Sequence, residues 1–224
     1  MFKDFRKFYL GMHPRKGILV DDIVKGQSIV PAIVRESSSN MITDNVFSYL
    51  LENRIIYMGE EFNPDTCNII VAQLLYLNQV DPDKDINIYI NSPGGSVTDL
   101  FAVLNTMNAI GNDVGTVCVG LAASCANLLL VSGAPGKRAA LPLSKLLTHQ
   151  PMGGARGQAS DIVIEANFIS ELKEDIAQIY MKHCGISHDE IWEKMDRDLW
   201  IRPENALPGK FGTLGQIDKV IDKI

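Results

Sequence analysis

Residues Asp85–Gly95, which read DINIYINSPGG, decide the fold that we predict for this chain. The segment from Asp85 to Asn91 has the composition of a strand, and the following Ser92-Pro93-Gly94-Gly95 predicts a turn. Glycines after a proline leave backbone N–H groups unhindered, as an oxyanion hole requires. A plain β-turn remains the alternative for the same four residues.

Strands and helices alternate on both sides of this segment. Asn63 followed by Pro64 is typical of a helix start, and Ser187 followed by Glu190 has the spacing of a capping box. Strands separated by helices require parallel crossovers, so the sequence predicts an α/β layered domain. The predicted strands cover residues 54–58, 85–91, 114–119, 137–141, 145–148 and 216–221. The predicted helices run from Thr43 or Asp44 to Asn53, from Pro64, from Gly95 to Ile110, from Ser124 to Gly133, from Ser160 to His183 and from Ser187.

The helix expected after Ser160 is unusually long. At a rise of 1.5 Å per residue, a helix of about 24 residues extends roughly 36 Å. Its apolar residues cover more than one stripe, so a second helix or another subunit must cover part of its surface.

Composition excludes several classes of protein. The chain has 224 residues, of which 46% are hydrophobic and 21% are charged, as in ordinary globular proteins. The formal net charge of −6 argues against nucleic acid or an anionic membrane as partner, because both need a basic surface. Four cysteines without a C-x-x-C motif suggest reduced thiols in a cytoplasmic protein.

One uncharged segment, residues 114–136, is long enough to span a bilayer. Gly115, Gly120, Gly133 and Pro135 interrupt it, so a buried strand, a turn and a buried helix explain it better. Residues 1–17 carry charges throughout and do not resemble a secretory signal. We therefore expect an N-terminal extension over residues 1–30, which could be a propeptide, and a single domain over residues 31–224.

Ser124 and His149 are candidates for nucleophilic catalysis. Ser124 stands between a predicted strand and a predicted helix among small residues, where its hydroxyl would point out of the sheet edge. It could equally be a helix-capping serine. His149 follows a strand and precedes a glycine-rich stretch, which suits a general base, although a structural histidine is the alternative.

Asp198 is a candidate for an acid that orients the histidine, since Leu199 and Trp200 can shield it from water. Asp196 is its rival. A salt-bridged surface is the alternative reading of Asp196-Arg197-Asp198. His183, near a helix end, can favourably meet the helix C-terminus as a cation. Neither a phosphate loop at residues 133–138 nor a metal-ligand cluster has the required spacing, so we expect no metal and no organic cofactor.

Taken together, these segments resemble the ClpP family, the proteolytic subunits of Clp proteases, from about Pro31 to Asp222. The resemblance is carried by DINIYINSPGG, by GLAAS at residues 120–124, by GKR at 136–138, by HQPMGG at 149–154 and by DRD at 196–198. Separations of 25 residues from Ser124 to His149 and of 49 from His149 to Asp198 match the family.

The resemblance implies a ClpP/crotonase-type α/β fold with a long handle helix after Ser160. It implies a serine endopeptidase with Ser124 as nucleophile, His149 as general base and Asp198 as the orienting acid. The N–H groups of Gly95 and Cys125 would form the oxyanion hole. The implied assembly is a tetradecamer of two stacked heptameric rings. The resemblance also implies that a Clp-class unfoldase ATPase supplies the rings with unfolded proteins. The implied role is protein quality control in the cytoplasm.

The sequence departs from most family members at several positions. Cys125 and Leu121 replace Met and Gln beside the nucleophile, and Asn87 and Ala109 replace aromatic residues of the ATPase-docking pocket. The stretch Pro208–Gly215 also looks longer than the family's turn. We therefore hypothesise a divergent paralogue that pairs with a second ClpP ring.

Three other readings of the sequence remain. They are a non-catalytic or weakly active ring subunit, a crotonase-type acyl-CoA enzyme, and a membrane-anchored serine peptidase.

Overall fold

The computed structural model describes residues 32–36, 41–209 and 214–223. The chain divides into two units, with the boundary between Tyr49 and Leu50. The predicted extension over residues 1–30 lies outside the described residues, as do residues 210–213 of the stretch that we expect to be longer than in relatives.

The described part of the first unit contains a hairpin that the sequence did not predict. Strands β1 (Ala32–Glu36) and β2 (Met41–Asn45) pair antiparallel, and helix α3 (Val46–Glu52) follows. The prediction that Thr43 or Asp44 caps this helix is wrong. Asn45 takes that role, because its Oδ1 atom accepts a hydrogen bond of 2.7 Å from the backbone N–H of Ser48.

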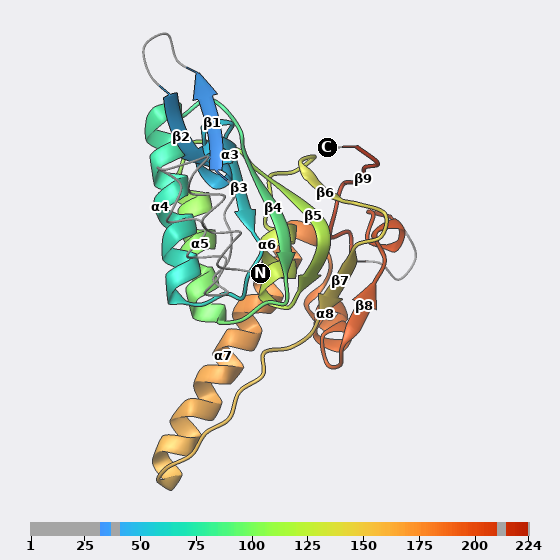
Figure 1. Ribbon diagram of the computed structural model, residues 1–224. Coiled ribbons are helices and arrows are strands. Elements are labelled where there is room, and N and C mark those ends of the chain that lie inside the picture. The colour runs from blue at the N-terminus through green and yellow to red at the C-terminus, as the bar shows by residue number, and fades with distance from the viewer. Residues whose placement is uncertain (1–31, 37–40, 210–213, 224) are drawn as a thin grey trace, which may run out of the picture. The chain divides into compact units, whose positions relative to one another are not determined.

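The second unit is built on a sheet in the order β3-β4-β5-β6-β9, in which all neighbours are parallel (Figure 1). These strands are β3 (Ile55–Met58), β4 (Ile86–Ser92), β5 (Val114–Ala123), β6 (Arg138–Ala140) and β9 (Lys219–Val220). Every strand that we predicted has a counterpart, which confirms the α/β prediction, although the last is only two residues long.

Strand β5 divides its pairing between two partners. Its first half pairs with β6, and its second half, Leu121–Ala123, pairs parallel with β7 (Lys145–Thr148). Strand β8 (Leu199–Ile201), which the sequence did not predict, pairs antiparallel with β7. The sheet therefore splits at the carboxyl end of β5, where Ser124 follows.

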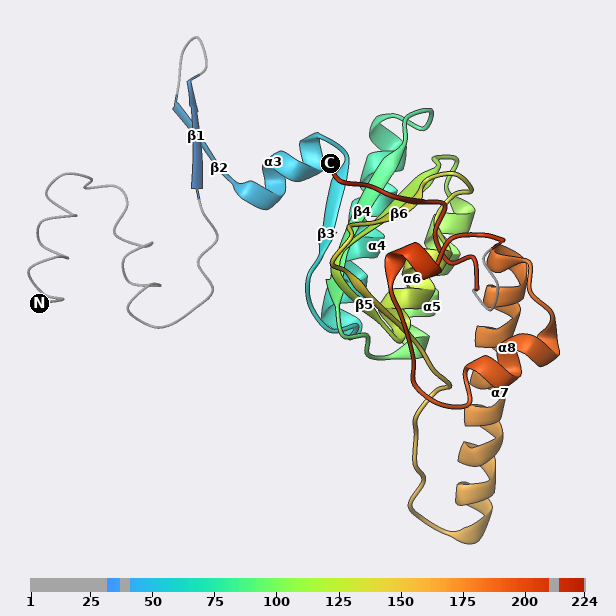
Figure 2. The same cartoon turned by 90° about the vertical axis from the view of Figure 1, so that its right-hand side faces the viewer.

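Helices separate the strands. They are α4 (Pro64–Val80), α5 (Val97–Ala109), α6 (Cys125–Val131), α7 (Ala159–Cys184) and α8 (His188–Lys194), with a 3₁₀ turn at Pro203–Asn205. The predicted start of α4 is confirmed, because the Asn63 and Thr66 side chains each accept a hydrogen bond from the other's backbone N–H. Figure 2 shows α5 and α6 on the same side of the sheet.

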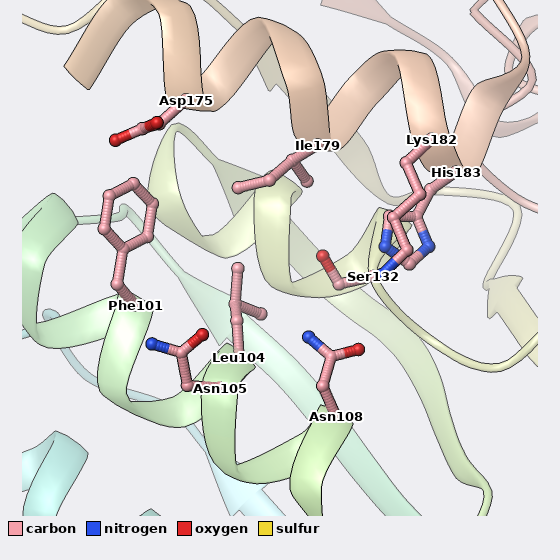
Figure 3. A pocket seen from close by; sticks show the side chains of 9 residues that line it. All are labelled: Phe101, Leu104, Asn105, Asn108, Ser132, Asp175, Ile179, Lys182 and His183. Carbon is pink, nitrogen blue, oxygen red and sulfur yellow. The ribbon is translucent and has the colours of Figure 1, made fainter. Parts of the chain in front are cut away.

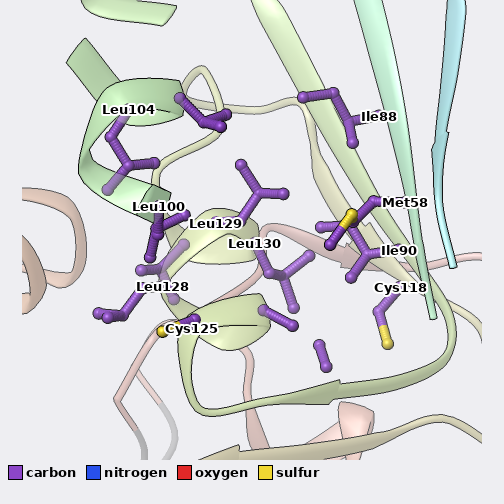
Figure 4. Packing of buried hydrophobic residues seen from close by; sticks show 14 of the residues in the cluster. Met58, Ile88, Ile90, Leu100, Leu104, Cys118, Cys125, Leu128, Leu129 and Leu130 are labelled. Carbon is purple, nitrogen blue, oxygen red and sulfur yellow. The ribbon is translucent and has the colours of Figure 1, made fainter. Parts of the chain in front are cut away.

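The core lies between the sheet and these helices. Ile86, Ile88 and Ile90 of β4 are fully buried, and every residue of α6 is buried. Figure 4 shows leucines of α5 and α6 in one hydrophobic cluster with Ile88 and Ile90 of β4. Residues 114–136 thus form a buried strand, a turn and a buried helix, as predicted. Among the described residues, no helix is both long and apolar enough to cross a membrane.

Helix α7 has the expected length but not the expected cap. It begins at Ala159 after Gln158, so the prediction that Ser160 caps it is wrong, and it ends before Gly185, which adopts the left-handed conformation with φ of 69°. Its N-terminal half projects beyond the rest of the second unit (Figure 1). Only its C-terminal half contributes buried residues, namely Ile176, Ala177 and Tyr180. The N-terminal half leaves Ile162, Val163, Ile164 and Phe168 exposed.

Candidate active site

The strand registers bring the three predicted catalytic residues to one edge of the sheet. Ala123 of β5 pairs with Leu147 of β7, so Ser124 and His149 both follow the carboxyl ends of adjacent parallel strands. Thr148 pairs with Leu199 of the antiparallel strand β8, which places the next residue, His149, opposite Asp198. Residues far apart in the sequence therefore converge because β7 lies between β5 and β8.

Ser124 has the backbone of a sharp strand-to-helix turn. Its φ and ψ are 56° and −123°, a conformation that non-glycine residues rarely adopt. Ser124 is the N-cap residue of α6, as the alternative reading expected, but its side chain makes no capping hydrogen bond to that helix. Its backbone is held firmly, because its N–H donates to Leu147 O at 3.0 Å and its carbonyl accepts from Asn127 and Leu128.

His149 is paired with Asp198 and not with Asp196. The Nδ1 atom of His149 lies 3.6 Å from Oδ1 of Asp198. Asp196 is engaged elsewhere, because its carbonyl accepts from Gln150 Nε2 at 2.8 Å and its carboxylate lies 3.7 Å from Arg197 Nε. The structure thus decides between the two acids that the sequence left as rivals.

Two features of this pair differ from expectation. Asp198 is not shielded, because its side chain is 63% exposed. Trp200 is itself 56% exposed, since β8 pairs only with β7 among the described strands and therefore lies at the edge of the sheet. The Nε2 atom of His149 is buried and has no hydrogen-bond partner among the described residues, so it makes no hydrogen bond to the Ser124 hydroxyl.

The Gly94–Gly95 turn packs directly against the nucleophile. A Cβ atom added to Gly94 would lie 2.7 Å from Ser124 Cβ, and Gly95 has a φ of 147°. Phe62 fixes the turn from the other side, because its N–H donates to Gly94 O and its carbonyl accepts from Ser96 N–H. The predicted strand that ends in a turn at Gly94 and Gly95 is confirmed. A turn that only reversed the chain would not need these close contacts with Ser124 and Phe62.

Cys125, the first residue of α6, reaches back to this turn. Its Sγ atom donates to Gly95 O at 3.1 Å. Burial raises the pKa of the Cys125 thiol to about 11, so the thiol keeps its proton at neutral pH. As the first residue of a helix, Cys125 also has a backbone N–H without an intrahelical acceptor, which is the kind of donor that binds anions. All four cysteines of the chain are free.

A separate cavity of about 310 Å³ lies between α5 and α7 and contains none of these residues (Figure 3). His183 lines it. The expectation that His183 is a cation at the helix end is wrong, because burial, followed by the nearby charges of Lys182 and Arg138, lowers its pKa to about 4. The neutral imidazole therefore makes no favourable charge interaction with the end of α7 at neutral pH.

The segment that we rejected as a phosphate loop serves the fold instead. Arg138 binds the carboxylate of Asp218 through both Nη2, at 2.6 Å, and Nε, at 3.1 Å, which ties β6 to the residue before β9. No group of three or more His, Cys, Asp or Glu side chains in the described part of the chain could hold a metal ion.

One feature beside the site was not predicted at all. Asn127, Thr148, Tyr180 and Gln216 form a buried set of hydrogen-bonded side chains. The single signal in the sequence was the placing of polar residues within apolar segments, for example Asn127 before three leucines.

Comparison with known proteins agrees with this geometry. The model of the Clp protease family matches residues 38–224. An ATP-dependent Clp protease proteolytic subunit of Bacteroides fragilis is 47% identical over 98% of this chain and 99% of its own length. A Porphyromonas gingivalis protein of the same name is 42% identical over 99% of this chain and 97% of its own length. An ATP-dependent Clp protease proteolytic subunit 1 of Prochlorococcus marinus is 46% identical over 87% of this chain and 97% of its own length.

These matches define the class as a serine-type endopeptidase, and the approach of a serine, a histidine and an aspartate at one edge of the sheet is consistent with that class. The chain belongs to the Clp protease family, because the family model and the relatives match it over nearly its whole length. The mixed sheet with the long helix α7 is consistent with the fold of that family.

Proposed function

We propose that Ser124, His149 and Asp198 are the catalytic triad of this peptidase. The observation that carries the proposal is the pair of strand registers that places Ser124 and His149 at adjacent strand ends and Asp198 3.6 Å from the imidazole. The left-handed backbone of Ser124, with no capping role for its hydroxyl, adds support.

The reaction is acyl transfer. His149 Nε2 accepts the proton of the Ser124 hydroxyl while Oγ attacks the carbonyl carbon of a peptide bond. The N–H groups of Gly95 and Cys125 stabilise the negative oxygen of the tetrahedral intermediate. The protonated imidazole then gives its proton to the leaving amine. Water, deprotonated by the same imidazole, attacks the acyl carbon, and the bond to Ser124 Oγ breaks as Oγ takes that proton from the imidazole. Asp198 orients the imidazole through Nδ1.

The substrates that we propose are unfolded proteins delivered by a Clp-class unfoldase ATPase and cut to short peptides in the cytoplasm. The assembly that we propose is a tetradecamer of two stacked heptameric rings. It is supported by the exposed apolar residues of α7, since neighbouring exposed apolar side chains on one helix are typical of a subunit interface.

A second candidate is a subunit with little activity on its own, paired with a second ClpP paralogue. Two observations favour it. His149 Nε2 has no partner within the described structure, and the 3.6 Å distance to Asp198 is long for a hydrogen bond. Catalytic hydrogen bonds are often long in unliganded enzymes, so the same observations are compatible with a fully active subunit.

Replacing Ser124 by alanine tests the triad. We expect Ser124→Ala to abolish hydrolysis of a fluorogenic peptide and labelling by a fluorophosphonate, because both need the hydroxyl. Arg202→Lys, at an exposed position away from the site, is the control and should leave both unchanged. Labelling that persists in Ser124→Ala would overturn the proposal, and a protein that hydrolyses acyl-CoA but never reacts with the fluorophosphonate would favour the crotonase-type alternative.

Assays with partners test the second candidate. The purified chain should form a ring whose peptidase activity rises when a second ClpP paralogue is added. Unchanged hydrolysis by the mixed particle after Ser124→Ala would show that this chain is a structural subunit. Mass spectrometry of the active particle tests the propeptide hypothesis, because an intact Met1 would reject it.

A further inference from the structure

Four buried polar side chains from four segments meet beside the candidate active site. They are Asn127 of α6, Thr148 of β7, Tyr180 of α7 and Gln216 near the C-terminus, and none is more than 1% exposed. We call this set the polar cluster. Buried polar groups are unfavourable unless they hydrogen-bond one another, so these bonds restrict how the four segments can pack.

The polar cluster is a closed ring of hydrogen bonds with one side chain attached. Gln216 Nε2 donates to Thr148 Oγ1 at 2.6 Å, Thr148 Oγ1 donates to Asn127 Oδ1 at 3.4 Å, and Asn127 Nδ2 donates to Gln216 Oε1 at 3.4 Å. The Tyr180 hydroxyl donates to Asn127 Oδ1 at 2.8 Å and lies 3.3 Å from Thr148 Oγ1. Burial raises the pKa of Tyr180, so its hydroxyl remains a donor at neutral pH.

The ring joins the two segments that carry the nucleophile and the base. Thr148 immediately precedes His149, and the backbone N–H of Asn127 donates to Ser124 O at 2.9 Å. A shift of β7 against α6 would therefore move His149 relative to Ser124, and it would also break bonds inside the ring. Tyr180 extends the same constraint to the buried half of α7.

We propose that Asn127, Thr148, Tyr180 and Gln216 are positioning residues that hold His149 at the correct distance from Ser124. The inference rests on the proposed triad and goes beyond it, because none of the four touches a reacting atom. A misplacement of about 1 Å can reduce a rate by about 100-fold, so small shifts of β7 are sufficient to be measured.

The test compares two substitutions of the same kind in the full-length, assembled protein. Thr148→Val removes a hydroxyl and leaves Gln216 Nε2 without its acceptor. Thr116→Val removes a hydroxyl that is also fully buried and donates to Leu130 O at 2.7 Å, but it lies outside the polar cluster. The measurements are kcat and KM for a fluorogenic peptide, the rate at which a fluorophosphonate labels Ser124, and the denaturation midpoint.

We expect Thr148→Val to lower kcat and the labelling rate about tenfold or more while KM changes less than about twofold. Thr116→Val should keep both rates within about twofold of those of the native protein, even if it loses as much stability as Thr148→Val. Thr148→Ser keeps the hydroxyl and should restore both rates. Tyr180→Phe, which removes one donor and little volume, provides a second variant if Thr148→Val fails to assemble.

Native kcat and labelling in both Thr148→Val and Tyr180→Phe would overturn the positioning role and leave the polar cluster a stabilising feature only. A fall of equal size in Thr116→Val would overturn it as well. A Ser124→Ala sample in the same assay separates this failure from failure of the proposed function, because persistent labelling there rejects the triad itself.

Discussion

At the residue scale, backbone conformation explains why particular side chains stand at the site. Ser124 adopts a φ that costs free energy in any residue other than glycine, and the fold retains it at the end of β5. Gly94 and Gly95 are required opposite, because a side chain at either position would collide with Ser124 or Phe62. The identities of the two glycines follow from this close approach of two turns.

Gly95→Ala should therefore impair both folding and catalysis. Its added Cβ would collide with Phe62 O and lie 2.7 Å from Phe62 N, at a φ of 147°. We expect kcat to fall by about 100-fold or more, the effect of losing one oxyanion donor. Gly136→Ala is the control, because its φ is 80° but its Cβ meets nothing within 4 Å. That variant should lose about 1 kcal/mol of stability and keep its kcat. Equal kcat values for the two variants would contradict the assignment of Gly95.

His183 should make the protein less stable in mild acid. Its pKa is about 4 in the folded chain, below the ordinary histidine pKa of about 6.5, so between these values the unfolded chain binds a proton that the folded chain does not. The free energy of unfolding therefore falls as pH falls through this window. Urea denaturation from pH 6.5 to 4 should show a weaker decline for His183→Asn than for the native chain.

His188→Asn is the comparison for that titration. Glu174, at 3.0 Å from Nε2, raises the pKa of His188, so the stability that this pair contributes is present at low pH and is lost as pH rises through the folded pKa. Removal of His188 should therefore alter the profile mainly above pH 6.5. An unchanged decline in His183→Asn would contradict the burial of a neutral imidazole.

At the element scale, a helix start was predicted correctly where neighbouring side chains cap the helix, and it was predicted wrongly where no side chain caps it. Asn63 and Thr66 satisfy each other within one turn, so the sequence shows the start of α4. Helix α7 starts after Gln158, whose side chain makes no capping hydrogen bond, so its start left no capping signal in the sequence and Ser160 misled the prediction. Strand β8 was missed because three residues carry too little periodicity.

The C-terminal end of α4 depends on a distant side chain. The Arg54 guanidinium donates to Leu77 O and Asp81 O at the helix end, and also to Lys84 O and Asp85 O. A lysine cannot reproduce this planar fork, so Arg54→Lys should cost about 1–3 kcal/mol in the free energy of unfolding. Arg202→Lys, whose side chain is 70% exposed, should cost less than about 0.5 kcal/mol. Chemical denaturation at pH 7 measures both, and equal losses would show that the four carbonyl contacts contribute nothing.

At the scale of the whole molecule, the exposed half of α7 should determine assembly. Ile164 is 67% exposed on a helix whose other half is packed, so a charge there should prevent two rings from stacking. We expect Ile164→Glu to halve the particle mass in native mass spectrometry and to lower peptidase activity. Leu143→Glu makes the same change at a residue that is 89% exposed in the turn between β6 and β7, and it should leave the particle intact. Native mass in Ile164→Glu would show that α7 does not join the rings.

The sequence by itself determined the order of most strands and helices and the α/β class, and it singled out Ser124, His149 and two acids as candidates. These follow from patterns within short segments, where each residue interacts with near neighbours. Only the tertiary structure decided that Asp198, not Asp196, faces His149, that His183 is neutral, and that four polar side chains close a ring beside the base. Those outcomes depend on strand register and burial, which arise from contacts between segments distant along the chain and leave no local pattern.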